Sequence, residues 1–341
     1  MSSPLILLNT VLLEHSQEKC INFLFLKNGF LVKILFAIKI DNYYNEKKKR
    51  GFVMEKRITG YTELLGLIAT PIRHSKSPTM HNAACRELGL DYAYLAFDIQ
   101  PEQLEDAVKG FKALNVRGWN VSMPYKTTIG QYLDHITPIA KMCGAINTVI
   151  NDNGVLTGTI TDGTGYMRAL KDRNIDIIGK KMTIVGAGGA ATAIVMQAAM
   201  DGVKEISIFN RKDPSWQRAK LNVKIINEQT GCKAQLFDLD DQEALRKEIE
   251  TSAIFTNGTN VGMGKLADMM VLPDTSFLRK DLVVSDVIYM PEKTKLLEEA
   301  EKIGCTTING LGMMLFQGAE SFKLWTNKDM PIDVVKKALD F

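Results

Sequence analysis

Residues 186–191 read Gly-Ala-Gly-Gly-Ala-Ala and stand between an apolar run and a helix-like stretch. This order predicts a strand, a tight glycine turn and the start of a helix, which is the part of a Rossmann unit that holds a dinucleotide pyrophosphate. Gly186 permits the turn, Gly188 lets the backbone approach phosphate closely, and Ala191 is small enough for the helix to pack on the strand. The spacing therefore predicts a nucleotide cofactor held by backbone N–H groups at a helix N-terminus.

Strand-like and helix-like segments alternate along the chain on both sides of this turn. The expected strands are 64–69, 92–99, 118–121, 181–185, 205–210, 253–257, 282–286 and 306–308, and the expected helices are 78–88, 101–114, 166–173, 192–200, 293–303, 315–326 and 332–339. Alternation of this kind predicts an α/β fold with helices on the faces of each sheet. We expect two domains: an N-terminal mixed-sheet α/β substrate domain, residues 54–162 joined by the last helices in 312–341, and a C-terminal Rossmann-type nucleotide-binding domain, residues 163–311.

Composition is that of an ordinary globular protein, with 45% hydrophobic and 24% charged residues among 341. Residues 1–53 hold eight Lys or Arg and four Asp or Glu, a charge of +4, so the rest of the chain, 34 basic against 35 acidic, carries −1 of the total +3. A nearly neutral body gives no electrostatic reason to expect nucleic acid or a membrane surface as a partner. The five cysteines are scattered, with no CxxC pair, so we expect neither disulfides nor a metal site, and a cytoplasmic setting.

The first 53 residues differ in character from the rest. The stretch 21–40 is apolar, but three lysines interrupt it and no cleavage site follows, so neither a membrane span nor a signal peptide is favoured. The run Lys47-Lys48-Lys49-Arg50-Gly51 requires purine-rich codons and stands just before Met54, as a translated ribosome-binding site would. We therefore expect residues 1–53 to be a non-native extension, with translation beginning at Met54; a genuine amphipathic extension is the alternative.

Polar residues gather where the apolar strands of the first half end, which is where α/β proteins place ligands. Ser75 and Ser77 stand two residues apart in a turn that opens a helix, which suits a carboxylate because hydroxyl donors and the helix N-terminus converge there. Capping of that helix by Ser77 is the alternative interpretation. Lys126 follows a strand that Pro124 ends, and Asn147 and Asp162 each stand at a turn among small residues. Each motif alone is more typical of turn chemistry than of a site.

The order of these motifs along the chain is more informative about function than any single motif. It comprises HSxSP at 74–78, NVSMPYK at 120–126, GAINT at 144–148, TDG at 161–163, the GAGGAA turn, Asn210-Arg211 after the second nucleotide strand, and Gly312 to Gln317. This order resembles the shikimate dehydrogenase family, and within it the quinate/shikimate dehydrogenase branch. The resemblance covers about residues 63–341, which is nearly everything after the N-terminal extension.

The resemblance implies roles for individual residues. Ser75 and Ser77 would bind the substrate carboxylate, Ser122, Asn147 and Gln317 would hydrogen-bond ring hydroxyls, and Tyr289 would lie where nicotinamide and substrate meet. Ser122 stands where the family usually has Thr, a change that keeps the hydroxyl. Lys126 and Asp162 would form the catalytic acid–base pair, with a purely structural ion pair as the alternative. Cofactor contacts would come from Gly186, Ala187, Gly188, Gly189, Ala190, Asn210, Arg211, Lys212, Asp213, Val287 and Gly310.

The expected activity is NAD(P)-dependent oxidation of shikimate or quinate. Arg211 and Lys212 favour the 2′-phosphate of NADP, whereas Asp213 favours the free ribose hydroxyl of NAD, so we expect NAD to be used and NADP tolerated. Two alternatives stay open: a family member acting on an amino-substituted shikimate, and a non-catalytic module that senses nucleotide or metabolite. A homodimer is neither required nor excluded by the sequence.

Overall fold

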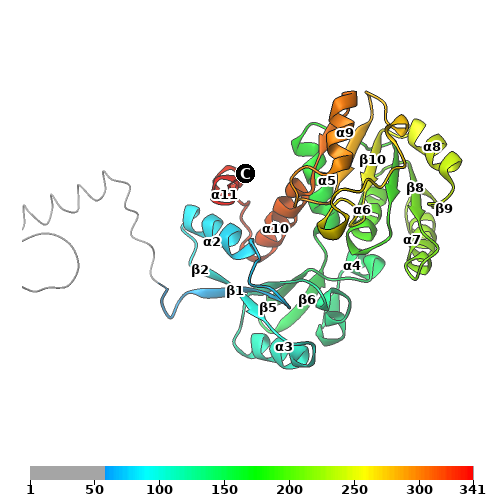
Figure 1. Cartoon of the computed structure of the whole chain (residues 1–341). Helices are drawn as coiled ribbons and strands as arrows, with labels where there is room; N and C mark the ends of the chain where they lie inside the picture. Colours follow the sequence, from blue (N-terminus) through cyan, green and yellow to red (C-terminus); the bar gives the residue numbers. More distant parts are fainter. Residues whose placement is uncertain (1–57, 341) are drawn as a thin grey trace, which may run out of the picture. The chain divides into compact units, whose positions relative to one another are not determined.

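The computed structural model describes residues 58–340, which form one compact unit. The hypotheses about residues 1–53 and about initiation at Met54 fall outside the described residues. Within the described part, the strands make two six-stranded sheets, with the order β2-β1-β3-β5-β6-β4 in the first and β12-β11-β10-β7-β8-β9 in the second. Figure 1 shows the two sheets and their helices side by side.

The first sheet is mixed. It contains β1 (Glu63–Ala69), β2 (Tyr92–Asp98), β3 (Gly118–Val121), β4 (His135–Ile136), β5 (Thr148–Asp152) and β6 (Val155–Thr159), with helices α2 (Ser77–Glu87), α3 (Leu104–Ala113) and α4 (Pro138–Cys143). β1 pairs in parallel with both β2 and β3, whereas β5 pairs antiparallel with β3 and with β6. The predicted mixed-sheet α/β arrangement is confirmed, although β4, β5, β6 and α4 were not predicted.

The second sheet is wholly parallel. Its strands are β7 (Lys181–Val185), β8 (Glu205–Asn210), β9 (Lys233–Asp238), β10 (Ile254–Asn257), β11 (Val283–Asp286) and β12 (Thr306–Ile308), and its helices include α6 (Gly189–Met200), α7 (Trp216–Gln229), α8 (Gln242–Glu250) and α9 (Lys295–Ile303). With β7 as first strand, this is the 3-2-1-4-5-6 order of a Rossmann sheet. β9, α7 and α8 were missed because they are amphipathic surface elements without an uninterrupted apolar run.

Three helices begin three or more residues earlier than their sequence patterns predict. α5 (Asp162–Asp172) begins four residues before Tyr166, α6 begins at Gly189, and α10 (Gly310–Thr326) begins five residues before Leu315. Each of the three has glycine in its first turn, and glycine disfavours helix in a local reading of the sequence. Packing requires one of these glycines directly: a methyl group on Gly163 would lie 2.2 Å from the Ala193 carbonyl oxygen. Tertiary contact therefore decides where such helices start.

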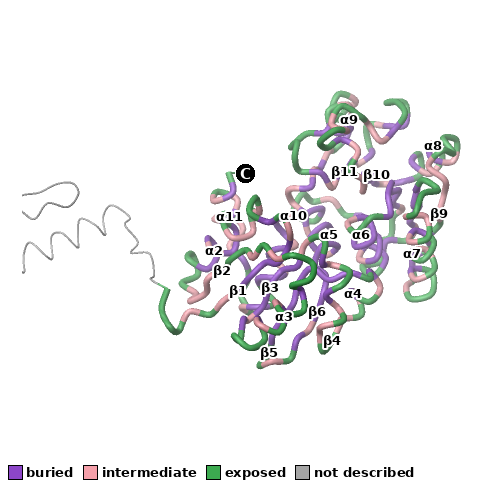
Figure 2. Tube along the Cα trace, turned by 60° about the horizontal axis from the view of Figure 1, so that its bottom comes forward, coloured by how far each residue is buried: buried purple, intermediate pink, exposed green. Residues whose placement is uncertain are grey.

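The final helices return to the first sheet, as predicted. α10 packs along α5, and α11 (Ile332–Ala338) packs against α2. Near the end of α10, Trp325 is buried and its indole N–H donates to the Val149 carbonyl of β5 at 2.9 Å. Figure 2 shows mostly buried residues along the central strands, and more exposed residues along helices such as α3, α7 and α8. We propose domain limits at 162/163 and 311/312, which lie at the N-terminal ends of α5 and α10, the two helices that pack along each other.

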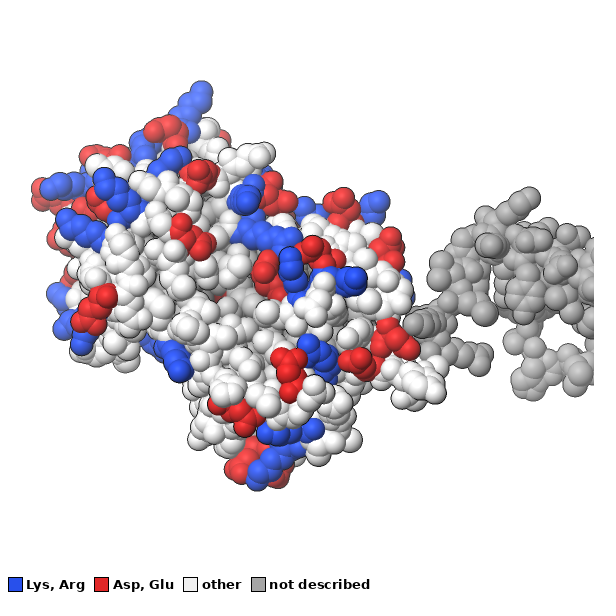
Figure 3. Space-filling view, turned by 180° about the vertical axis from the view of Figure 1, so that it is seen from behind, with Lys and Arg blue, Asp and Glu red and all other residues white. Residues whose placement is uncertain are grey.

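The described surface carries no large imbalance of charge on the face shown in Figure 3, where acidic and basic side chains are interspersed. Among residues 58–340, no helix combines the length and the apolar character needed to cross a bilayer.

Candidate active site

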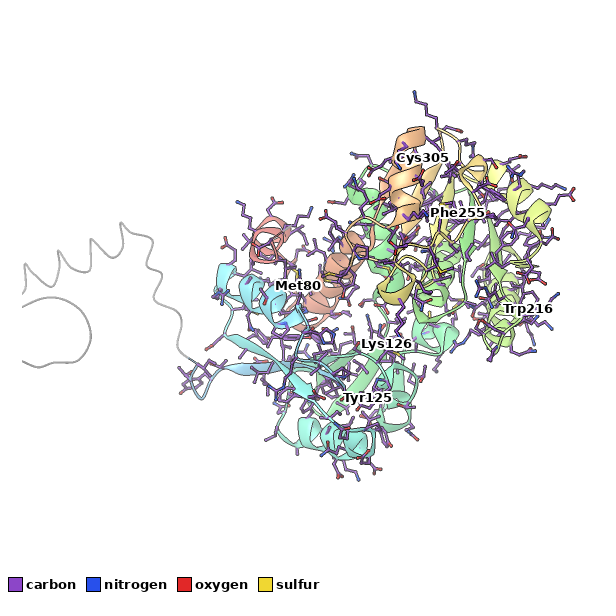
Figure 4. All side chains as sticks on the ribbon, viewed as in Figure 1. Met80, Tyr125, Lys126, Trp216, Phe255 and Cys305 are labelled. Carbon is purple, nitrogen blue, oxygen red and sulfur yellow. The ribbon has the colours of Figure 1, made fainter. Side chains whose placement is uncertain are left out.

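Lys126 and Asp162 form an ion pair at the edge of the first sheet. Lys126 lies in a short 3-10 turn, Tyr125–Thr127, that follows β3, and Asp162 is the first residue of α5. The ammonium Nζ lies 2.6 Å from Asp162 Oδ2, and the two side chains are 25% and 13% exposed. Lys126 is labelled in Figure 4, where it lies between the elements of the first sheet and those of the second sheet. The fold thus brings together the two residues that the sequence singled out as an acid–base pair.

Asn147 holds the second oxygen of the Asp162 carboxylate. Its side-chain amide Nδ2 lies 2.9 Å from Asp162 Oδ1 and 3.2 Å from Gln317 Oε1, while its Oδ1 accepts the Thr161 backbone N–H at 2.9 Å. Asp162 is therefore fixed from both sides, by the ammonium at one oxygen and by the amide at the other. A carboxylate with two charge-assisted partners keeps its orientation without help from a ligand.

A cavity of about 600 Å³ opens around this pair. It is lined by every residue that the sequence predicted for substrate binding or catalysis, namely Ser75, Ser77, Ser122, Lys126, Asn147, Asp162, Tyr289 and Gln317, and also by the predicted cofactor residues Ala190, Val287 and Gly310. Its other lining residues include His74, Lys76, Asn120, Met290, Met313 and Met314. Because hydroxyl, amide, ammonium and carboxylate groups face one space, the cavity suits a small polar acid.

Ser77 does not cap the helix that it opens. Ser77 is the first residue of α2, Lys76 is the N-cap residue and no side chain caps that helix, so capping of the helix by Ser77 is wrong. The Ser77 backbone N–H instead donates to Ser75 Oγ at 3.2 Å. The Ser77 side chain lines the cavity.

A second cavity, of about 350 Å³, lies against the glycine turn. Its lining includes the predicted cofactor residues Gly186, Ala187, Gly188, Asn210, Arg211 and Asp213. Gly186 has a φ of +110°, which only glycine adopts readily, and a methyl group built on Gly188 would meet nothing within 4 Å. This open cradle at the start of α6 fits a pyrophosphate. Two of the predicted cofactor residues, Gly189 and Lys212, line neither cavity.

A buried anchor, the hydrogen-bonded pair Asn257 and Asp286, holds the loops that border the two cavities. Asn257, at the end of β10, accepts the Thr259 N–H and donates to both carboxylate oxygens of Asp286, and Asp286 in turn accepts the Ile288 N–H and the Thr294 hydroxyl. Burial raises the pKa of Asp286 to about 6, against the opposing effect of these hydrogen bonds. The anchor was missed by sequence reasoning because its partners lie 29 residues apart.

Comparison with known proteins identifies the chain. Residues 67–149 match the model of the shikimate dehydrogenase substrate binding domain, and residues 310–339 match that of the shikimate 5'-dehydrogenase C-terminal domain. A protein named shikimate dehydrogenase (NADP(+)) from Listeria monocytogenes is 64% identical over 284 residues, which cover 83% of this chain and 98% of that protein. The chain belongs to the shikimate dehydrogenase family.

Solved structures of the family agree with this membership. A shikimate 5-dehydrogenase of Listeria monocytogenes, in complex with shikimate and NAD, is 64% identical with a TM-score of 0.82, and covers 84% of this chain and 99% of its own. A quinate dehydrogenase of Corynebacterium glutamicum, in complex with NAD, is 28% identical with a TM-score of 0.73, and covers 82% and 98%. The predicted family, including its likeness to quinate-acting members, is confirmed.

A buried network of polar side chains beside the cavity of about 600 Å³ was also missed by sequence reasoning. The Tyr94 hydroxyl donates to Asn120 Oδ1 at 2.8 Å, and Asn120 Nδ2 donates to Ser321 Oγ at 3.1 Å. Ser321 lies 2.7 Å from the Thr148 hydroxyl, which donates to Asn147 Oδ1. Asn120 was part of a quoted motif, but Ser321 looked like an ordinary helix residue, since Asn120 and Thr148 lie more than 170 positions away from it.

No group of three or more His, Cys, Asp or Glu side chains between residues 58 and 340 is arranged to hold a metal ion.

Proposed function

We propose that this protein catalyses the reversible NAD(P)-dependent oxidation of shikimate to 3-dehydroshikimate. The observation that carries the proposal is the Lys126–Asp162 ion pair. It lies inside a cavity that is also lined by Ser75, Ser77, Asn147 and Gln317. The 64% identical relative named shikimate dehydrogenase (NADP(+)) supports the same substrate.

Substrate binding follows from the chemistry of the lining. The Ser75 and Ser77 hydroxyls at the start of α2 would receive the ring carboxylate, because hydroxyl donors and a helix N-terminus both favour an anion. The Ser122 hydroxyl and the Asn147 and Gln317 amides would hydrogen-bond the ring hydroxyls. Tyr289, 42% exposed on the loop after β11, would close the side of the cavity nearest the nucleotide.

Lys126 and Asp162 would handle the proton. A bound nicotinamide supplies or accepts the hydride. During oxidation, Lys126 would first pass a proton to Asp162 and then, as a neutral amine, take the proton of the reacting hydroxyl. During reduction its ammonium would return that proton and stabilise negative charge on the oxygen. Asp162, held by Asn147, would keep the ammonium aimed at that oxygen and share its proton.

The cofactor would extend from the cavity at the glycine turn to the cavity that holds Lys126 and Asp162. Gly186, Ala187 and Gly188 would hold the pyrophosphate, Asn210, Arg211 and Asp213 would face the adenosine ribose, and Val287 and Gly310 would border the nicotinamide end. We propose that NAD and NADP are both used, with NAD preferred. Arg211 supports NADP, whereas Asp213 supports NAD because its carboxylate repels a 2′-phosphate.

Quinate is a second candidate substrate, because a quinate dehydrogenase is among the related solved structures. Initial rates with shikimate and then quinate, each with NAD and with NADP, test the whole proposal. Turnover of shikimate is expected, and the ratio of kcat/KM values ranks the two acids and the two cofactors. An absence of turnover with all four pairs would refute the dehydrogenase assignment and favour a sensor or an enzyme for an altered ring acid.

A further inference from the structure

The ammonium group of Lys212 is held in an ion pair beside the nucleotide cavity, and Lys212 does not line that cavity. Lys212 Nζ lies 2.5 Å from Asp238 Oδ2, and Lys212 also lies over the ring of Trp216, 5.9 Å from its centroid. The residues on either side of Lys212, Arg211 and Asp213, line the cavity, but Lys212 does not. Figure 4 shows Trp216 at the outer side of the second sheet. The lysine is therefore held away from the space that its two neighbours face.

Asp238 occupies an informative position in the sheet. In NAD-selective Rossmann sites an acidic residue at the end of the second strand binds the ribose hydroxyls, whereas NADP-selective sites place a basic residue there. Here the second strand, β8, ends at Asn210, and the acid stands beside it, since Asp238 is the register partner of Asn210 on β9. The next residue, Leu239, lines the nucleotide cavity.

We propose that Asp238 is a specificity-determining residue that withholds Lys212 from the 2′-phosphate of NADP and so keeps NAD competitive as cofactor. The inference rests on the proposed dehydrogenase function, and it assigns to Asp238 an effect on the relative affinity for NAD and NADP. The Asp238 carboxylate keeps its charge at neutral pH, because the hydrogen bond from Lys212 and a further one from the Asp240 N–H lower its pKa.

The exposure of the pair sets the size of the effect. The Lys212 side chain is 67% exposed and that of Asp238 is 24% exposed, so the pair is a solvent-screened one of modest strength. Breaking such a pair changes affinity by a factor of about five rather than by orders of magnitude. The expected result is therefore a protein that accepts both cofactors, since a 2′-phosphate competes with Asp238 for the lysine at small cost.

Asp238→Asn in the full chain tests the proposal, because it removes the acid's charge and keeps its shape. The dissociation constants of NAD and NADP are measured by quenching of tryptophan fluorescence, together with kcat/KM for each cofactor. We expect NADP to bind about five-fold more tightly and NAD binding to stay unchanged. In the double variant with Lys212→Met, the gain for NADP should disappear, because the released cation is then missing.

Glu299→Gln is the matched control. Glu299 pairs with Lys302 on α9 at 2.7 Å, with exposures of 26% and 66% that nearly equal those of Asp238 and Lys212, and it lines neither cavity. It should leave the NADP-to-NAD ratio unchanged. The proposal is overturned if Asp238→Asn shifts that ratio less than about two-fold, or if the shift survives Lys212→Met. Since binding is measured apart from turnover, an inactive protein would refute the proposed function while the binding ratio still decides this inference.

Discussion

Replacing Asp162 by Asn should nearly abolish turnover while leaving cofactor binding intact. The Asn side chain keeps the volume of Asp162, and its oxygen can still accept the Asn147 amide. Its own amide group would then face Lys126 Nζ, now 2.6 Å from a carboxylate oxygen, so that two donors meet and the pair is broken. Neither residue of the pair lines the nucleotide cavity at the glycine turn.

The expected magnitude has two parts. A charge-assisted hydrogen bond contributes about 1.5–3 kcal/mol to the orientation of the ammonium, which is about 10- to 150-fold in rate if expressed at the transition state. Acid–base participation of a positioned side chain contributes about 10²–10⁴-fold. Because the two effects act through one group and overlap, we expect kcat to fall by about 10²–10⁴-fold in total, with the NADP dissociation constant changed less than about two-fold.

The assay is the initial rate of nicotinamide reduction with saturating shikimate, accompanied by a fluorescence titration with NADP. Asp329→Asn is a suitable control, because Asp329 pairs with Lys323 at 2.8 Å on the surface, with side chains 73% and 55% exposed. That variant should keep wild-type turnover, since an exposed pair contributes little. If Asp162→Asn retained more than about a tenth of the wild-type kcat, the acid–base role of the pair would be refuted.

Three further predictions concern glycine positions and one buried acid. Gly188→Ala should leave the unfolding free energy nearly unchanged, because its methyl group meets nothing within 4 Å, yet weaken NADP binding about ten-fold or more by filling the cradle; unaltered binding in a titration would contradict the cradle. Gly118→Ala should destabilise the fold by about 2–4 kcal/mol in urea unfolding, because the methyl group would lie 2.2 Å from Trp325 Nε1; a cost below about 1 kcal/mol would contradict this packing. Burial raises the pKa of Asp286 from 3.8 to about 6, so the folded state holds this proton more tightly than the unfolded chain, and the group's contribution to stability decreases as pH rises from about 4 to about 6. The stability of the wild type relative to Asp286→Asn should therefore fall by about 2 kcal/mol between pH 4 and pH 7, and a pH-independent difference would show that the carboxyl is not perturbed.

Local sequence was sufficient for the elements whose pattern is continuous. The buried strands β1, β3, β7, β8, β10 and β11 were predicted close to their observed limits, because apolar runs bounded by turn residues are readable within a few positions. The strands β4 and β9 were not predicted, since their pairing partners lie elsewhere in the chain. The strands β5 and β6 were missed although they form a local hairpin around Asn153-Gly154, two residues with positive φ that are a turn signal readable from the sequence.

For the candidate site, sequence alone determined which residues were available: the glycine turn, the two serines, the Lys126 and Asp162 pair, and the family that contains them in this order. Tertiary structure decided how they act together. It fixed Asp162 through Asn147, placed Ser321 of α10 against Thr148, and paired Lys212 with Asp238 instead of directing it to the nucleotide. Such contacts join segments 15 to 173 residues apart, and an exposed or helical polar residue carries no local mark of its distant partner. The residue types determine which chemistry is possible. Folding determines which charged side chains line the cavities and which are held in ion pairs outside them.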